Sequence, residues 1–140
     1  MLNKRSDIFQ ESWVTKLTNR CILSVRGRDA TELLQNTSTQ DMKLFEKSID
    51  RAAIYTSFLT VKGKTMLDAF VVKPRLAGQT SDDMEYWVDI HENDEEQLRK
   101  HLRKYAMRKN IQIENISHVI KSFSMQSLAG VGSPEGFFFP

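Results

Sequence analysis

Apolar and polar residues alternate in several short segments of the chain. Residues 20–26 alternate after Cys21 with one break, and residues 84–90 (Met-Glu-Tyr-Trp-Val-Asp-Ile) alternate for most of their length. Such a period of two is typical of strands that bury one face. The pattern predicts strands at 20–26, 51–60, 65–73 and 84–90, and two final short strands at 111–114 and 119–123.

Two of these strands are expected to form a hairpin. The segments 51–60 and 65–73 are separated by Val61-Lys62-Gly63-Lys64, in which Gly63 can adopt a positive φ without steric cost. The loop is slightly longer than that of the tightest hairpins. The polar segment 74–83 that follows is expected to be the least ordered part of the chain.

A change to helical spacing predicts a first helix after residue 28. Asp29 stands at the N-cap position and Glu32 follows three residues later, which is the spacing of a capping box. Ala30, Leu33 and Leu34 give this helix an apolar face. The polar run 36–41 ends it.

A second helix is predicted from Asn93 or Asp94 to about Met107. Its buried stripe consists of Leu98, Leu102 and Tyr105. Acidic residues lie near its N-terminus and basic residues near its C-terminus, an order that suits the helix dipole.

The order of strands and helices predicts an α+β fold with a mainly antiparallel sheet and helices on one face, in a ferredoxin-like arrangement. We expect an N-terminal extension at 1–16, the first part of a domain at 17–125, and a tail at 126–140. Phe137-Phe138-Phe139 would expose much apolar surface on a soluble monomer. The tail is therefore expected to mark a truncation, with the phenylalanines packed on missing chain or on a partner.

Composition narrows the possible partners and cofactors. The chain has 140 residues, enough for one domain with a real core, and its net charge of +2 does not indicate nucleic-acid binding. A single cysteine, Cys21, excludes an internal disulfide and a cysteine-rich metal site. No apolar run approaches the roughly 18 residues of a membrane span, so no membrane partner is expected. His91, His101 and His118 lie on different elements without metal-ligand spacing.

Asp68 is the first candidate for chemistry, because it lies within an apolar strand. Alternation places Met66, Asp68 and Phe70 on one face, and a carboxylate among apolar neighbours costs free energy unless something pairs with it. A ligand amine or a protein donor could be that partner. A carboxylate on a solvated face is the more common outcome.

Two basic features are the other candidates. Lys62 and Lys64 at the hairpin tip could attract an anionic ligand tail, although lysines are common in solvated turns. The basic segment 99–109 could bind RNA or an acidic partner. Because acidic residues precede it, a solvated helix matched to its dipole is the favoured interpretation.

Three segments, in order, resemble a known family. They are Leu-Ser-Val-Arg-Gly-Arg-Asp-Ala at 23–30, the hairpin at 53–68 with its Lys-Gly-Lys tip, and Leu-Arg-Lys-His-Leu-Arg-Lys-Tyr-Ala-Met-Arg-Lys-Asn-Ile-Gln-Ile at 98–113. Between about Leu17 and Ser117, the chain resembles the glycine-cleavage T-protein and its YgfZ-like relatives. The resemblance implies a ring of subdomains that binds tetrahydrofolate near its centre.

The same resemblance implies roles for particular residues. An aspartate at the position of Asp68 contacts the pterin side of folate, and a tyrosine at the position of Tyr55 lines the pocket. This chain has Leu67 where the T-protein branch has a second acidic residue, and Val72 where it has another pocket tyrosine. The T-protein's Asp-x-Ser-His-Met-Gly opening is also absent, so the YgfZ-like, iron–sulfur branch is favoured.

The implied function is a tetrahydrofolate-binding factor for the assembly of [4Fe–4S] clusters. It would work with other iron–sulfur assembly proteins in the mitochondrial matrix, or in the cytoplasm if the source is bacterial. A folate-dependent aminomethyltransferase and a degenerate, non-catalytic subunit of a larger assembly remain alternatives, and enzymatic turnover stays open. The branch's Lys-Gly-Cys-Tyr-x-Gly-Gln-Glu motif does not occur in this chain.

Overall fold

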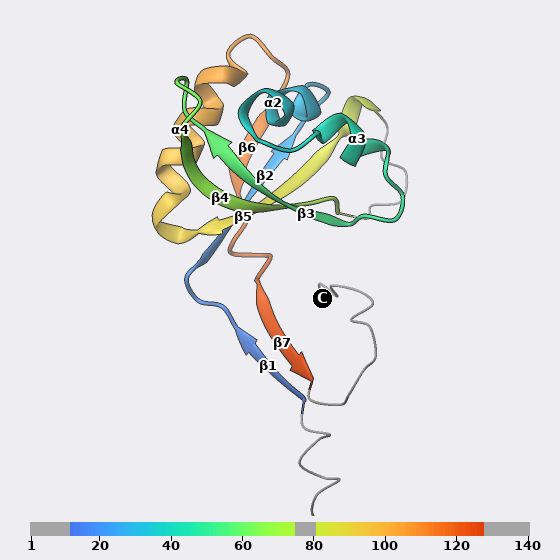
Figure 1. The fold of residues 1–140 in the computed structure, drawn as a ribbon, viewed down its shortest axis with the longest axis vertical. Coiled ribbons are helices and arrows are strands. Elements are labelled where there is room, and N and C mark those ends of the chain that lie inside the picture. Colours follow the sequence, from blue (N-terminus) through green and yellow to red (C-terminus); the bar gives the residue numbers. More distant parts are fainter. Residues whose placement is uncertain (1–11, 75–80, 128–140) are drawn as a thin grey trace, which may run out of the picture.

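The structure, a computed structural model, describes residues 12–74 and 81–127. Its body is a five-stranded sheet with the order β3-β4-β5-β2-β6, in which every neighbouring pair is antiparallel (Figure 1). The strands are β2 (Arg20–Arg26), β3 (Ala53–Leu59), β4 (Thr65–Val72), β5 (Glu85–His91) and β6 (Gln112–Asn115). The predicted α+β class and the mainly antiparallel sheet are therefore confirmed.

Within the described residues, three helices pack on one face of this sheet. They are α2 (Ala30–Thr37), α3 (Met42–Lys47) and α4 (Glu95–Ala106), and short 3-10 turns lie at Ser81–Asp83 and Glu92–Asp94. The core between helices and sheet contains, among others, Leu23, Val25, Leu33, Leu34, Phe58, Val71, Tyr86, Val88, Leu98 and Leu102. The apolar faces predicted for α2 and α4 are thus confirmed, although Tyr105 is only partly buried. The helix α3 was not predicted.

The opposite side of the sheet, which we call the open face, is not covered by any described helix. It is formed by the strand residues that alternate with the core residues, including Arg20, Ser24, Tyr55, Ser57, Asp68, Phe70, Glu85, Trp87 and Asp89. The burial pattern of β4 confirms the alternation for Asp68 and Phe70, which lie opposite Leu67, Ala69 and Val71. Met66, predicted on the face of Asp68, is instead partly buried against the core, at the point where the register with β3 shifts.

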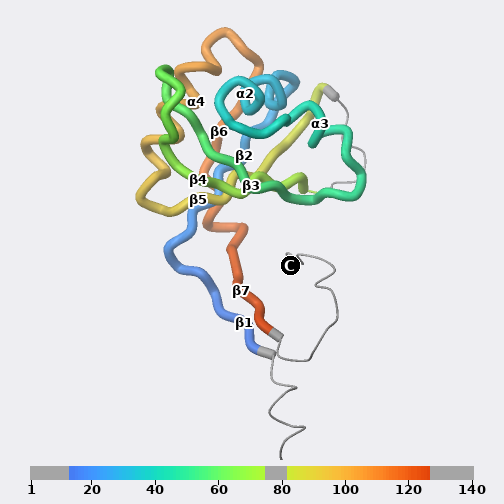
Figure 2. Tube along the Cα trace, in the orientation of Figure 1, coloured from blue at the N-terminus to red at the C-terminus, as the bar shows by residue number. Residues whose placement is uncertain are grey.

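A separate two-stranded ribbon extends away from the body (Figure 1, Figure 2). It pairs β1 (Ser12–Lys16) with β7 (Phe123–Ser127) in antiparallel register. The strand predicted at 119–123 is wrong, because the backbone N–H groups of Val119 and Ile120 both donate to the carbonyl of Ile116 and form a turn. The division at 1–16, 17–125 and 126–140 stays a prediction, and Phe137–Phe139 lie outside the described residues.

The first helix begins as predicted, but not through the predicted capping box. Asp29 makes no side-chain bond to the start of α2; its Oδ2 accepts instead from the backbone N–H of Asn110 at 3.2 Å. Glu32 forms an ion pair with Lys109 at 3.5 Å. Both carboxylates therefore connect the start of α2 to the segment before β6. These contacts join residues far apart in the sequence, so the local spacing could not predict them.

Gly27 explains how that segment comes so close. Its φ is +137°, and a Cβ built on it would lie 2.1 Å from the carbonyl oxygen of Asn110. Only glycine permits both the backbone conformation and this approach. The predicted hairpin turn is confirmed as well, with Gly63 at φ +75°.

Candidate functional site

The hairpin β3–β4 brings four side chains together on the open face. Tyr55 is paired with Phe70, and Ser57 with Asp68, in the strand register. The Ser57 hydroxyl donates to Oδ1 of Asp68 at 2.7 Å. The rings of Tyr55 and Phe70 meet edge to face with their centroids 5.5 Å apart. This cluster contains both residues, Tyr55 and Asp68, that the sequence proposes for folate.

Hydrogen bonds set the charge state of the cluster. The bonds from Ser57 and then Tyr55 hold the pKa of the Asp68 carboxyl below its usual value. The bond to Asp68 raises the pKa of the Tyr55 phenol. At neutral pH the cluster therefore presents an ionised carboxylate, which accepts hydrogen bonds, beside a neutral phenol.

The cluster is open to solvent. The side chains of Tyr55 and Phe70 are 52% and 45% exposed, which is high for aromatic residues in the middle of strands. Asp68 is exposed too, so the solvated-face alternative raised from the sequence describes its position. The Ser57 hydroxyl and the Tyr55 phenol are its protein partners, and a ligand amine is not needed to satisfy the carboxylate. Single-strand alternation did not identify Ser57, because the contact depends on the register with β4.

A second group on the open face was missed from the sequence. Oε1 of Glu85 accepts from the Ser24 hydroxyl at 2.7 Å and from the Trp87 indole Nε1 at 3.0 Å. Trp87 is paired with Val72 across β4 and β5. Glu85 thus holds the indole ring on the open face, and Trp87 lies two residues along β5 from Asp89, the residue paired with Phe70. The strict alternation of 84–90 contained this signal, since it places Glu85 and Trp87 on one face.

The hairpin lysines are not part of these contacts. Lys62 and Lys64 are exposed at the tip, and among the described residues no contact joins either ammonium group to Tyr55 or Asp68. The backbone N–H of Lys64 donates to the Thr60 hydroxyl at 3.2 Å, a bond within the turn. Their role toward an anionic tail remains a prediction.

Other potential sites in the described residues offer less chemistry. Cys21 is buried, and burial raises the pKa of its thiol, so it is a poor nucleophile and metal ligand. In residues 12–74 and 81–127, no three His, Cys, Asp or Glu side chains are grouped so that they could hold a metal ion. None of the helices described there is long and apolar enough to cross a membrane.

Comparison with known proteins identifies relatives with one shared role. The chain is 33% identical over 108 residues to the mitochondrial iron–sulfur cluster assembly factor IBA57 homolog of Neosartorya fischeri, covering 73% of this chain and 24% of that protein. The corresponding protein of Aspergillus oryzae is 32% identical over 102 residues, covering 70% of this chain and 23% of its own length. The chain is similar to a segment of the IBA57 homologs. It spans about a quarter of the length of these curated relatives.

A solved structure supports the fold independently. The glycine cleavage system aminomethyltransferase T from Bartonella henselae matches with a TM-score of 0.66 and 16% identity, over 90% of this chain and 32% of that one. No model of a protein family matches the chain. The resemblance to the T-protein fold and to the iron–sulfur assembly branch, predicted from three short segments, is thereby confirmed.

Proposed function

We propose that the open face forms one wall of a tetrahydrofolate site in an iron–sulfur cluster assembly factor. The observation that carries this proposal is the cluster of Tyr55, Ser57, Asp68 and Phe70. Exposed aromatic rings beside an ionised carboxylate suit a flat heterocycle that carries N–H donors, as a pterin does.

The donor set of the cluster fits that ligand. Ser57 and Tyr55 each bond to the Asp68 carboxylate, which has about four acceptor positions. Capacity therefore remains for N–H groups of a pterin after the protein's own bonds are made. Trp87, fixed by Glu85, extends the aromatic surface across β5. Residues from the rest of a longer protein would complete the site.

Calorimetry with tetrahydrofolate on the full-length gene product tests the site. Asp68→Asn keeps the shape and one acceptor but removes the charge, and a hydrogen bond to a charged group contributes about 1.5–3 kcal/mol. We expect affinity to fall by roughly tenfold to a hundredfold. Asp82→Asn makes the same change at another exposed carboxylate and should leave affinity unchanged. Equal affinity of the Asp68 variant would exclude Asp68 from the site.

The role in cluster assembly and the mitochondrial location are supported by the names of the relatives. In cells that lack the protein, we expect the activity of [4Fe–4S] enzymes to fall while enzymes without clusters keep theirs. A fluorescent fusion should co-localise with a mitochondrial matrix marker. Normal activity of [4Fe–4S] enzymes in cells that lack the protein would refute the assembly role and would leave the folate proposal unaffected.

The aminomethyltransferase alternative uses the same open face, so binding alone does not separate the two. An assay for turnover of methylenetetrahydrofolate with an aminomethyl carrier separates the two functions. We expect folate binding without such turnover, because Leu67 and Val72 replace the acidic residue and the tyrosine of the T-protein branch. If the unaltered protein bound no folate but co-purified with a stable partner that covers Phe137–Phe139, the non-catalytic subunit would be indicated instead.

A further inference from the structure

The two edges of the sheet differ in how they are protected. On the outer side of β3, the backbone N–H of Thr39 donates to the carbonyl of Ser57 at 3.0 Å, and the N–H of Ser57 donates to the Thr39 hydroxyl at 3.2 Å. On the outer side of β6, no described residue pairs with the strand. Proteins usually cover or blunt such edges, because their unpaired backbone groups recruit other strands.

The phase of the ladder shows which backbone groups of β6 are free. The N–H of Ile116 donates to the carbonyl of Ile22 at 2.9 Å, and bonded and non-bonded pairs alternate along an antiparallel ladder. The pair Val25–Ile113 is consequently of the non-bonded type. Ile113 and Asn115 therefore direct their N–H and C=O groups away from β2, toward the outer edge.

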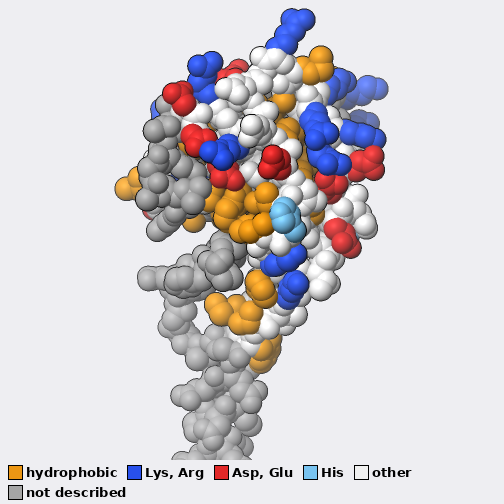
Figure 3. Space-filling view, turned by 180° about the vertical axis from the view of Figure 1, so that it is seen from behind, with side chains coloured by type: hydrophobic (Ala, Val, Ile, Leu, Met, Phe, Trp, Pro, Cys, Tyr) orange, Lys and Arg blue, Asp and Glu red, His pale blue; other side chains and the backbone are white. Residues whose placement is uncertain are grey.

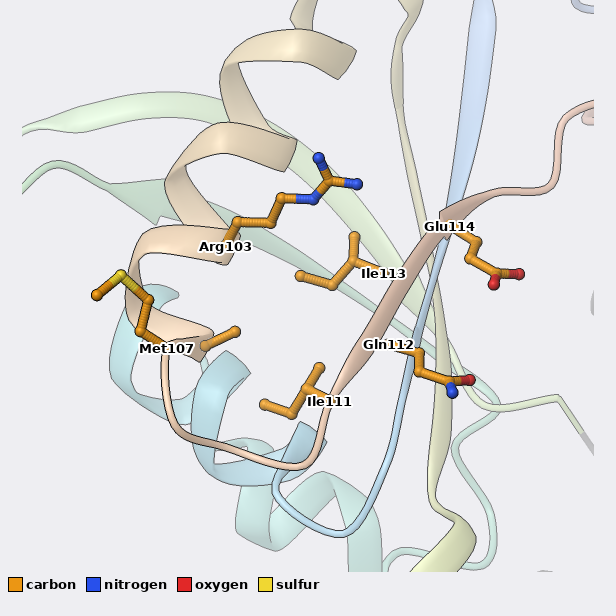
Figure 4. A pocket seen from close by; sticks show the side chains of 7 residues that line it. Arg103, Met107, Ile111, Gln112, Ile113 and Glu114 are labelled. Atoms are coloured by element: carbon orange, nitrogen blue, oxygen red, sulfur yellow. The ribbon is translucent and has the colours of Figure 1, made fainter.

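A hollow of about 430 Å³ lies beside this edge, between β6 and the C-terminal half of α4 (Figure 4). It is lined by Arg103, Ala106, Met107, Ile111, Gln112, Ile113 and Glu114. The side chains of Ile111 and Ile113 face the helix, whereas Gln112 and Glu114 project on the other side of the strand (Figure 4). Met107 is 71% exposed there, so the hollow offers apolar surface to a partner.

Arg103, which lines the hollow together with Glu114, is one of three cations in and just after the last turn of α4 that are unpaired among the described residues. Three cations of the α4 region are neutralised by carboxylates: Arg99 by Glu95, Lys100 by Glu96 and Lys109 by Glu32. Arg103, Lys104 and Arg108 are exposed and form no ion pair with any residue that the structure describes. Lys and Arg side chains gather on the α4 side of the molecule, at the upper right of Figure 3. This side attracts an anionic partner.

We propose that the outer edge of β6 and the C-terminal half of α4 form a docking surface for an extended acidic segment of a partner protein. The segment adds to the sheet as a strand beside β6, a recurring mode of peptide recognition in which backbone bonds give affinity and pockets give specificity. Its apolar side chains enter the hollow, and its acidic side chains face Arg103 and the neighbouring cations. This surface lies at the β6 edge, and the cluster of Tyr55 and Asp68 lies on the β3–β4 hairpin at the opposite edge of the sheet, so the inference does not depend on folate binding.

The alternation of side chains along an added strand determines the sequence of the test peptide. In an added strand, alternate side chains face α4, and the others lie beside Glu114. The fluorescein-labelled peptide Asp-Thr-Val-Thr-Val-Thr-Asp places valines in the hollow, aspartates toward the cations and threonines beside Glu114. The peptide Lys-Thr-Val-Thr-Val-Thr-Lys reverses only the charge. Fluorescence anisotropy with the full chain should show binding of the acidic peptide and at least about tenfold weaker binding of the basic one.

Two variants test the surface itself. Arg103→Glu should weaken binding of the acidic peptide by about tenfold or more, since it turns attraction into repulsion at the hollow. Met107→Ser removes the exposed apolar wall and should also weaken it. Both side chains are exposed, so neither change should prevent folding. Lys43→Glu makes the same charge reversal as Arg103→Glu on α3 and should leave affinity unchanged.

Hydrogen exchange distinguishes strand addition from charge attraction alone. The amides of Ile113 and Asn115 should exchange quickly in the free protein and at least about tenfold more slowly with saturating acidic peptide. Binding without this protection would overturn strand addition. Protection of both amides before peptide is added would also overturn the proposal, because the edge would already be covered by the chain's own segments or by a second copy. Equal binding of both peptides, or of the Arg103 variant, would overturn the proposal.

Discussion

The Ser57 hydroxyl donates to Oδ1 of Asp68 at 2.7 Å, from the directly paired position of the neighbouring strand. This bond is the largest cause of the lowered pKa of the Asp68 carboxyl. Ser57→Ala should raise that pKa toward its ordinary value, since the ionised form loses a donor. Carbon-13 NMR titration of the Asp68 carboxyl measures the change directly.

Ser57→Thr is the matched control for that titration, because threonine keeps the hydroxyl and suits a strand. In this variant the pKa of the Asp68 carboxyl should stay nearly as low as with Ser57. If alanine and threonine gave the same pKa, the Tyr55 bond alone would control Asp68.

Gly27 should be the least replaceable glycine in the described residues. Gly27→Ala introduces a Cβ 2.1 Å from the Asn110 carbonyl oxygen and forces a side chain into a φ of +137°. We expect a loss of about 3 kcal/mol or more in the free energy of unfolding, since strain of this kind costs about 1–3 kcal/mol before any clash is counted. Urea denaturation measures it.

Gly63→Ala provides the comparison, because Gly63 also has a positive φ but a Cβ there meets nothing within 4 Å. Its cost should be only about 1 kcal/mol, the conformational penalty alone. Similar losses at both positions would show that the approach of Asn110 to Gly27 is not tight in solution.

Local periodicity was sufficient to predict most of the strands and two of the helices. It was not sufficient to predict contacts that depend on the register between strands. The alternation around Asp68 was read correctly, whereas the Ser57 contact appears only when β3 and β4 are aligned. The spacing of Asp29 and Glu32 indicated a local cap, yet both side chains bond to residues about eighty positions away. A single-chain pattern carries no information on such partners.

The ribbon shows the same limit. A segment of apolar residues at 119–123 predicts a strand by composition, but the N–H groups of Val119 and Ile120 turn back to Ile116. The strand β7 begins at Phe123 because β1, more than one hundred residues earlier in sequence, supplies its partner. Each of these strands has only five residues of mixed polarity, so neither sequence shows a clear period of two.

His101 should make the fold less stable in mild acid. Burial lowers its pKa below the ordinary 6.5, and its Nε2 is buried without a hydrogen-bond partner among the described residues. The unfolded chain therefore takes up the proton first as the pH falls. Stability contributed by the neutral ring is complete above about pH 6.5 and declines below it, toward the lowered folded-state pKa.

Urea midpoints measured between pH 7.5 and 5 would reveal this slope. His101→Gln cannot titrate and should flatten the curve in this window, whatever it costs at neutral pH. His118→Gln, which leaves the buried ring in place, should keep the slope. An unchanged slope in the His101 variant would assign the acid sensitivity to other groups.

Asp89 should hold the ribbon to the body. Its Oδ1 accepts from Nε of Arg20 at 2.8 Å, and its Oδ2 accepts from the Ser122 hydroxyl at 2.9 Å, immediately before β7. An isolated two-stranded ribbon is marginally stable, so its order depends on this anchor. Asp89→Asn removes the charge that both donors face and should lower the free energy of unfolding by about 1–3 kcal/mol.

Hydrogen exchange measures where this loss falls. The amides of β1 and β7 should lose protection in the Asp89 variant while those of β5 keep it. Ser122→Ala, which removes only the ribbon's bond, should reproduce the loss in the ribbon with a smaller effect on global stability. Equal loss of protection in ribbon and sheet would instead mean that the two unfold as one unit.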